Sequence, residues 1–212
     1  MAINKIVKML IVADFATNSA FGLLAPIFAI YLSLNIAGGG AAVAGFATST
    51  YWAVKSLLQL PIAKFLDRTD GERDDFYALV IGQLFASSTF FLYLYASLPW
   101  HIYAIEALLG AAMAFVVPAW YGIFTRHIDK DRTSFEWSLE SVFSVGVATA
   151  VAGALGGMIA ENYGFDVLFA GAGALALLGT FLQIFLYPHL TAKDGHGETF
   201  SLADEKGRQK II

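Results

Sequence analysis

Residues 15–54 read FATNSAFGLLAPIFAIYLSLNIAGGGAAVAGFATSTYWAV, and this stretch contains no Asp, Glu, Lys or Arg. A helix needs about 20 consecutive apolar residues to cross a membrane, so the stretch is long enough to hold parts of two such helices. The division falls at Asn35 and at the glycines of residues 38–40, because a run of glycines ends a helix. The stretch therefore predicts two transmembrane helices rather than part of a soluble domain.

Uncharged stretches continue along the chain, at residues 76–105, 107–125, 141–160 and 167–192. Only 14% of the residues are charged and 58% are hydrophobic, whereas a soluble domain has about 25% charged residues. We therefore predict an all-α membrane protein with six transmembrane helices in a domain that covers residues 1–187, followed by a polar cytoplasmic tail at 188–212. The predicted helices span roughly residues 6–34, 41–65, 76–97, 101–124, 138–160 and 166–187.

The basic residues are confined to alternate connections between the predicted helices. Short loops rich in Lys and Arg stay on the cytoplasmic side of a membrane. We therefore expect an integral protein of the plasma (inner) membrane with both termini in the cytoplasm. Of the 13 lysines and arginines, Lys55 lies inside the second predicted helix, and the others lie on the cytoplasmic side: Lys5, Lys8, Lys64, Arg68, Arg73, Arg126, Lys130, Arg132, Lys193, Lys206, Arg208 and Lys210.

An acid and a proline recur at one spacing in the first and the fourth predicted helices. The interval from Asp14 to Pro26 along the chain equals the interval from Glu106 to Pro118. A unit of three helices leaves the next unit to enter the membrane from the opposite side, so the recurrence predicts an inverted repeat. The two predicted units cover residues 6–97 and 101–187. The second and fifth predicted helices also end alike, in an acid followed by a turn glycine: Asp67 and Gly71, then Glu161 and Gly164.

The turn after the second predicted helix resembles a signature of the major facilitator superfamily. In that family a glycine, the pair Asp-Arg and a second glycine precede the third helix. Here Ala63 takes the place of the first glycine, Asp67 and Arg68 match, and Gly71 comes one residue late. Residues 153–164 look like the fifth helix of the family and its following turn. The resemblance implies one six-helix half of a facilitator, built as a 3+3 inverted repeat.

This resemblance implies a secondary transporter that moves a small-molecule substrate by alternating access, coupled to a proton or another cation. In the full-length fold the substrate site lies between two six-helix halves, so we expect a homodimer or pairing with an unidentified membrane partner. Membrane lipid is the other expected partner. The alternative function is a non-transporting membrane subunit, or an assembly scaffold, built on a facilitator half-fold.

Several charged residues lie inside the predicted helices, where a charge costs about 2.5 to 3.5 kcal/mol and normally faces a cavity or a partner. Asp14, Lys55 and Glu106 are the candidates for a substrate or ion pathway. We predict that Asp14 and Lys55 form an ion pair, which either lines the pathway or only ties the first two helices together. Glu106 is either a proton or cation site or a side chain that reaches out to the outer interface. Glu140 is assigned to the start of the fifth helix, where negative charge suits the helix dipole.

Other residues are assigned gating or structural roles rather than contact with a substrate. In the resembled family the turn after the second helix acts as a cytoplasmic clasp, and prolines bend helices that line the cavity. The gating or structural set comprises Asp67, Arg68, Gly71, Glu161 and Gly164, and the predicted helix bends are at Pro26 and Pro118.

Composition argues against several other classes of protein. There is no cysteine, and the four histidines are scattered without the spacing of metal ligands. No catalytic constellation and no P-loop is recognisable, and a net charge of -4 gives no basic surface for nucleic acid. We therefore expect no enzyme activity, no metal, no cofactor and no nucleic-acid partner.

Overall fold

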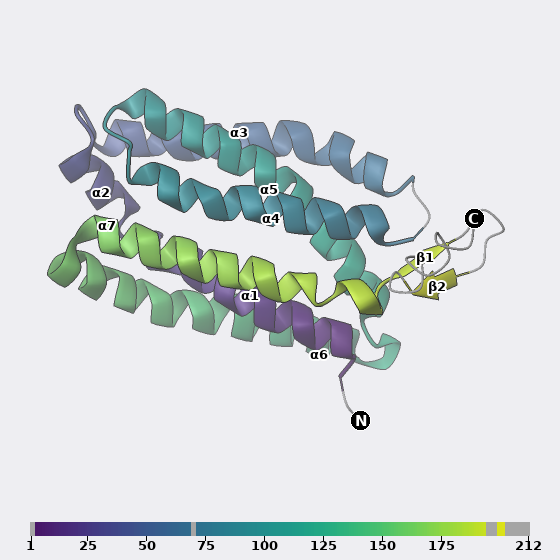
Figure 1. Ribbon diagram of the computed structural model, residues 1–212. Coiled ribbons are helices and arrows are strands. Elements are labelled where there is room, and N and C mark those ends of the chain that lie inside the picture. Colours follow the sequence, from purple (N-terminus) through teal and green to yellow (C-terminus); the bar gives the residue numbers. More distant parts are fainter. Residues whose placement is uncertain (1–2, 69–70, 194–198, 202–212) are drawn as a thin grey trace.

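The computed structural model describes residues 3–68, 71–193 and 199–201, so most of the predicted tail at 188–212 lies outside the described residues. The described chain is almost entirely helical, and the helices run roughly along one axis (Figure 1). Its elements are α1 (Lys5–Leu24), α2 (Phe28–Asn35), α3 (Ala41–Leu66), α4 (Arg73–Tyr93), α5 (Pro99–His127), η1 (Lys130–Arg132), α6 (Thr133–Leu139), η2 (Glu140–Val147), α7 (Ala148–Ile184), η3 (Tyr187–His189), β1 (Thr191–Lys193) and β2 (Thr199–Ser201).

The first predicted span, residues 6–34, is interrupted and forms two helices. α1 begins after Asn4, whose side chain accepts a hydrogen bond from the Ile6 amide and so caps the helix. The interruption lies at residues 25–27, between α1 and α2. Pro26 lies in it, and proline has no amide hydrogen to continue a helix.

The last part of the chain contains a long helix that folds back on itself. α7 contains Gly164, whose φ of 84° is not helical and marks a kink. Glycine is suited to this position because a side chain is strained at positive φ. Figure 1 shows the two arms of α7 side by side, returning toward the end where the termini lie.

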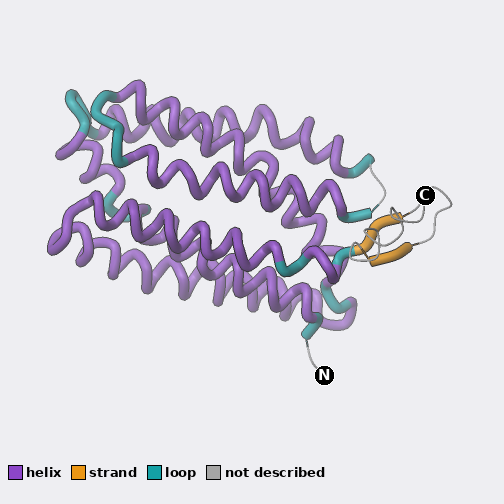
Figure 2. The backbone as a smooth tube through the Cα atoms, viewed as in Figure 1, coloured by secondary structure: helices purple, strands orange, loops and turns teal. Residues whose placement is uncertain are grey.

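Among the described residues, four helical segments are long and apolar enough to cross a membrane. They are Lys5–Leu24, Arg73–Tyr93, Pro99–His127 and the continuous segment Lys130–His189, which contains both arms of α7. A short antiparallel hairpin of β1 and β2 follows the last helix, with Thr191 opposite Ser201. Figure 2 shows this hairpin at the end of the bundle that also holds the termini.

The helices associate in two groups, α5 with α3 and α4, and α1 with both arms of α7, and α4 also packs against α7 (Figure 1). Contact between α1 and α7 is close because small residues meet there. A methyl group on Gly156 would lie 1.9 Å from the Leu23 carbonyl oxygen, and one on Gly179 would lie 2.4 Å from Thr17 Oγ1. In the other group, a methyl group on Gly110 would lie 2.6 Å from the Tyr51 carbonyl oxygen. Glycine at these points lets helix backbones approach, as membrane helices require.

Candidate functional site

A cavity of about 260 Å³ with both polar and apolar walls lies between α1, α4, α5 and the α6–η2 segment. Asp14 and Glu140 both line it and are both half-buried. No basic side chain is among the described residues that line it. We call this space the Asp14 cavity, and its described lining contains two carboxyl groups and no basic group.

Glu140 reaches this cavity because the chain changes its helical geometry there. Residues Glu140–Val147 form a π-helix, a wider turn that is frequent at functional sites. Ser144 Oγ, on the same turn, donates a hydrogen bond to the Ile11 carbonyl oxygen at 3.1 Å, and Phe143 stacks on Phe15 with ring centroids 4.7 Å apart. These contacts hold η2 against α1, and Glu140 and Asp14 line the same cavity. The sequence assignment of Glu140 to a helix start alone missed this role, because a π-turn leaves no clear signal in composition.

Three aromatic rings form another part of the same wall. Trp120 and Tyr121 come from α5, and Trp137 comes from α6. The centroid of the Trp137 ring lies 6.1 Å from that of Trp120 and 6.0 Å from that of Tyr121. The cavity therefore combines carboxylates with the electron-rich faces of aromatic rings.

One buried donor in this wall lacks a hydrogen-bond partner. Gln83 is 2% exposed and lines the cavity, and no acceptor among the described residues meets hydrogen-bond geometry with its Nε2. Trp120, which is 5% exposed, faces the Asp14 carboxylate instead. Because buried donors are nearly always paired, the Gln83 amide could donate a hydrogen bond to a bound molecule.

A second cavity, of about 350 Å³, adjoins the first and contains Glu106. We call it the Glu106 cavity, and Asn18, Phe21 and Met113 line both spaces. Glu106 is 7% exposed, and its Oε1 accepts a hydrogen bond of 2.8 Å from Tyr93 Oη. The alternative that Glu106 reaches out to the outer interface is therefore wrong.

Lys55 lies away from Asp14. Its Nζ is 4.6 Å from the centroid of the Trp52 ring and 5.6 Å from that of Tyr51, as in a cation–π contact. Among the ion pairs of the described residues there is none between Lys55 and Asp14. The predicted pair is not formed, because Lys55 turns along α3 toward its own aromatic neighbours while Asp14 faces α5 and η2.

The ionic contacts at the end of the bundle where α4 begins involve other residues than the predicted clasp. Asp67 and Arg68 are exposed at the end of α3. Instead, Arg126 on α5 pairs with Glu72 through Nε at 3.1 Å and with Asp75. Glu72 also accepts a hydrogen bond of 3.0 Å from the Thr191 amide, which ties β1 to the start of α4. These partners are far apart in sequence, and no local spacing indicates them.

The predicted turn glycines and prolines differ in what they do. Gly71 and Gly164 both have positive φ, 104° and 84°. Glu161, the acid that precedes Gly164, is exposed. Pro26 separates two helices, whereas Pro118 lies inside the continuous helix α5. Within the described ranges, no group of three His, Asp or Glu side chains is arranged to hold a metal ion.

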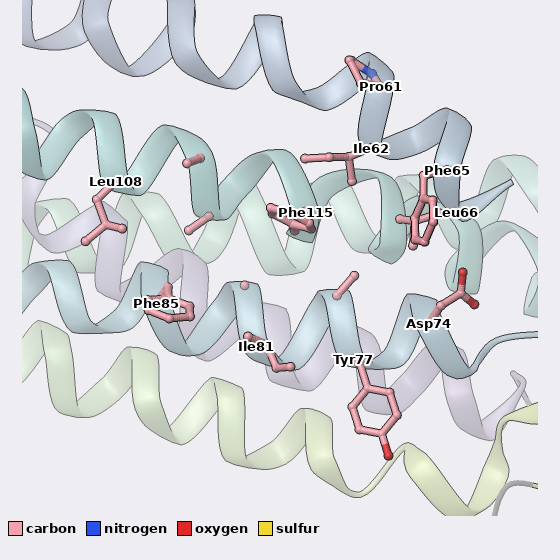
Figure 3. A pocket seen from close by; sticks show the side chains of 14 residues that line it. Pro61, Ile62, Phe65, Leu66, Asp74, Tyr77, Ile81, Phe85, Leu108 and Phe115 are labelled. Atoms are coloured by element: carbon pink, nitrogen blue, oxygen red, sulfur yellow. The ribbon is translucent and has the colours of Figure 1, made fainter. Parts of the chain in front are cut away.

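A larger cavity of about 800 Å³ lies between α3, α4 and α5 and shares no residue with the Asp14 cavity. Figure 3 shows Phe65, Phe85 and Phe115 around it, with Asp74 at one end. Its lining is otherwise almost entirely apolar. It offers few groups that could orient a polar solute, so the acid-bearing cavities are the better candidate site.

Comparison with known proteins places this geometry in context. The sequence profile of the Major Facilitator Superfamily matches residues 10–207. Among solved structures, the in meso crystal structure of the POT family transporter PepTSo is similar, with a TM-score of 0.71 and 14% sequence identity. The match covers 88% of this chain and 38% of that chain, so this chain spans well under half the length of PepTSo. No curated protein matches the sequence.

Proposed function

The chain belongs to the Major Facilitator Superfamily, and we propose that it is a secondary transporter that moves a small solute by alternating access. The observation that carries this proposal is the pair of adjoining cavities with Asp14 and Glu140 in one and Glu106 in the other. Ionisable groups are costly at membrane depth and typically mark solute or ion pathways. The family and the fold point to transport rather than to enzyme catalysis.

The arrangement of six transmembrane helices as a 3+3 inverted repeat is part of the proposal. In an inverted repeat, contact between the first and fifth helices should correspond to contact between the fourth and second. α1 packs closely on the first arm of α7, and α5 packs closely on α3, in agreement with this correspondence. The corresponding turn glycines, Gly71 and Gly164, share the left-handed backbone region. In this arrangement α1 with α2 forms the first helix, and the two arms of α7 belong to the fifth and sixth.

We also propose that both termini face the cytoplasm in the plasma (inner) membrane. Support comes from the basic residues, which gather on one side of the predicted topology. Because the chain has no native cysteine, single cysteines at Ala37, Pro99 and Lys130 make a direct test in intact cells. An impermeant maleimide is expected to label the first two and to spare the third. Labelling of Lys130→Cys alone would show that the orientation is the opposite of the proposed one.

A homodimer is proposed as the assembly that encloses the pathway. α3 and the first arm of α7 expose large apolar side chains: Leu57 is 74% exposed, Leu60 is 76% exposed and Met158 is 60% exposed. These faces suit burial against a second copy. Native mass spectrometry in mild detergent is expected to show the dimer mass, and a monomer that transports after reconstitution would contradict this assembly.

Coupling to a proton or another cation is assigned to Glu106. Its carboxylate is buried beside Tyr93 in a cavity, where gain and loss of a charge changes its hydrogen bonding. In proteoliposomes with an imposed proton gradient, Glu106→Gln should abolish accumulation of solute but retain exchange across the membrane, because the amide keeps the shape but cannot titrate. Accumulation equal to that of the parent protein would contradict the coupling role.

The function itself is tested by solid-supported membrane currents on proteoliposomes, measured while a panel of amino acids, peptides, sugars and amines is added. We expect current with at least one class of solute and its loss in the double variant Asp14→Asn, Glu140→Gln. Asp131→Asn, which removes one negative charge at an exposed position, serves as the control. The alternative, a non-transporting membrane subunit or scaffold, predicts no current with any solute and stable association with an unrelated membrane protein.

A further inference from the structure

We infer that the Asp14 cavity binds a small organic cation that carries a protonated amine, an aromatic or apolar body and a hydrogen-bond acceptor. This inference rests on the proposed transport function for its biological use, because it names the substrate class of the same pathway. The binding it describes can be measured without transport.

The charge of the ligand follows from the carboxylates in the wall. Asp14 and Glu140 lie close enough to interact electrostatically, and no basic side chain is among the described residues that line the cavity with them. Two carboxylates that face one space away from bulk water repel each other unless one of them is protonated or a cation lies between them. An anionic ligand would add to this repulsion, so the cavity selects against it.

The body of the ligand follows from the rings beside the carboxylates. Trp120, Tyr121 and Trp137 come together with centroids about 6 Å apart. Aromatic faces attract cations, and tryptophan does so most strongly. Together with carboxylates, they favour an organic ammonium group over a hydrated metal ion, which prefers oxygen ligands.

The acceptor follows from the unpaired donor. Gln83 is 2% exposed, and its Nε2 has no hydrogen-bond partner among the described residues. A ligand oxygen in the cavity would satisfy this group, which otherwise lowers stability. The volume of about 260 Å³ limits the ligand to a small molecule, and the adjoining Glu106 cavity provides the route of further movement.

Binding is tested on the purified full chain in detergent, with Trp fluorescence as the readout because Trp120 and Trp137 line the cavity. The probes are 2-phenylethylamine, its neutral analogue 2-phenylethanol, and tyramine, which adds a hydroxyl oxygen. We expect 2-phenylethylamine to bind at least about tenfold more tightly than 2-phenylethanol. Equal binding of the amine and the alcohol would show that the cation assignment is wrong.

Variants locate the binding. Asp14→Asn and Glu140→Gln should each weaken amine binding by about tenfold, while the exposed Asp131→Asn should leave it unchanged. Gln83→Leu should weaken the binding of tyramine more than that of 2-phenylethylamine. Equal weakening of both would show that Gln83 does not bind a hydrogen-bond acceptor of the ligand. If the carboxylate variants do not fold, the comparison of the three probes on the unaltered protein still decides.

The outcome is separable from that of the proposed function. Amine binding with no current for any solute would leave the cation site standing and overturn transport. Current with a neutral or anionic solute, without amine binding, would support transport and overturn the organic-cation site.

Discussion

Asp14 and Glu106 occupy corresponding places before a proline in the chain, but their surroundings differ. Glu106 is 7% exposed, and Tyr93 donates a hydrogen bond to it at 2.8 Å. Asp14 is half-buried and faces a second carboxylate, Glu140. One acid therefore has a hydroxyl partner supplied by the fold, whereas the other shares its cavity with a second carboxyl group and with the unpaired Gln83 amide.

If the proposed transport function holds, this difference predicts that the two cavities bind different species. A carboxylate paired with a tyrosine hydroxyl is held in one geometry and suits the exchange of a small ion. Two carboxylates with aromatic rings and an unpaired amide suit a larger molecule that brings its own charge. Two acids at the same spacing before a proline thus have different chemical environments, set by the helices around them.

The largest expected effect is on stability, and it compares the close helix contacts near the two cavities. Gly156→Ala should lower the free energy of unfolding by about 3 kcal/mol, because its methyl group would lie 1.9 Å from the Leu23 carbonyl oxygen beside α1. Gly110→Ala, on the Glu106 side, should cost less because the nearest atom is 2.6 Å away. Thermal unfolding in detergent measures both.

Gly157→Ala is the matched control, since nothing lies within 4 Å of the added methyl group. It should unfold at the temperature of the parent protein. Equal melting temperatures for Gly156→Ala and Gly157→Ala would show that α1 and α7 are not packed as described.

The next effect concerns the hydroxyl that distinguishes Glu106. Tyr93→Phe should destabilise the protein by about 2 kcal/mol, because it leaves a buried carboxylate oxygen without its donor. Tyr95→Phe removes a hydroxyl from a residue that is 82% exposed and should be neutral. Denaturation by heat with circular dichroism detection compares the two, and an unchanged Tyr93→Phe would make the two acids more alike than the structure indicates.

A smaller effect of opposite sign is expected in the Asp14 cavity. Without ligand, Gln83→Leu should stabilise the protein by about 1 kcal/mol, because it removes a buried amide that lacks a partner. Ser87→Ala, one turn further along α4, should instead destabilise by a similar amount, since Ser87 Oγ donates to the Gln83 carbonyl oxygen at 2.8 Å. Loss of stability in Gln83→Leu would mean that the amide has a structural partner rather than a binding role.

The smallest effect separates Asp14 from Lys55. In a double-mutant cycle of Asp14→Asn and Lys55→Met, the losses of stability should add to within about 0.5 kcal/mol, because Lys55 contacts Trp52 and Tyr51 instead. A coupling energy well above that value would show that Asp14 and Lys55 do form an ion pair, which would link α3 to the Asp14 cavity.

Particular stretches of the sequence predict that this is a membrane protein and which family it belongs to. Residues 15–54 lack charge and are longer than one span, and the helical character of this region follows because lipid offers no partner for free backbone groups. Gly71 and Gly164 were assigned to turns, and both have positive φ. These features depend on local composition and backbone strain, which neighbours in sequence determine.

By itself, then, the sequence determined a helical membrane protein of the Major Facilitator Superfamily and named Asp14 and Glu106 as ionisable groups within it. Only the tertiary structure decided what surrounds them: Glu140 shares the cavity of Asp14, and Tyr93 from α4 donates a hydrogen bond to Glu106. It also decided that Glu72 pairs with Arg126, whereas Asp67 and Arg68 are exposed. The physical reason is that hydropathy and turn propensity act over a few residues, whereas a side-chain contact depends on the rotation of two packed helices about their axes. A shift of one residue along a helix turns a side chain by about 100°, and no spacing along the chain reveals that rotation.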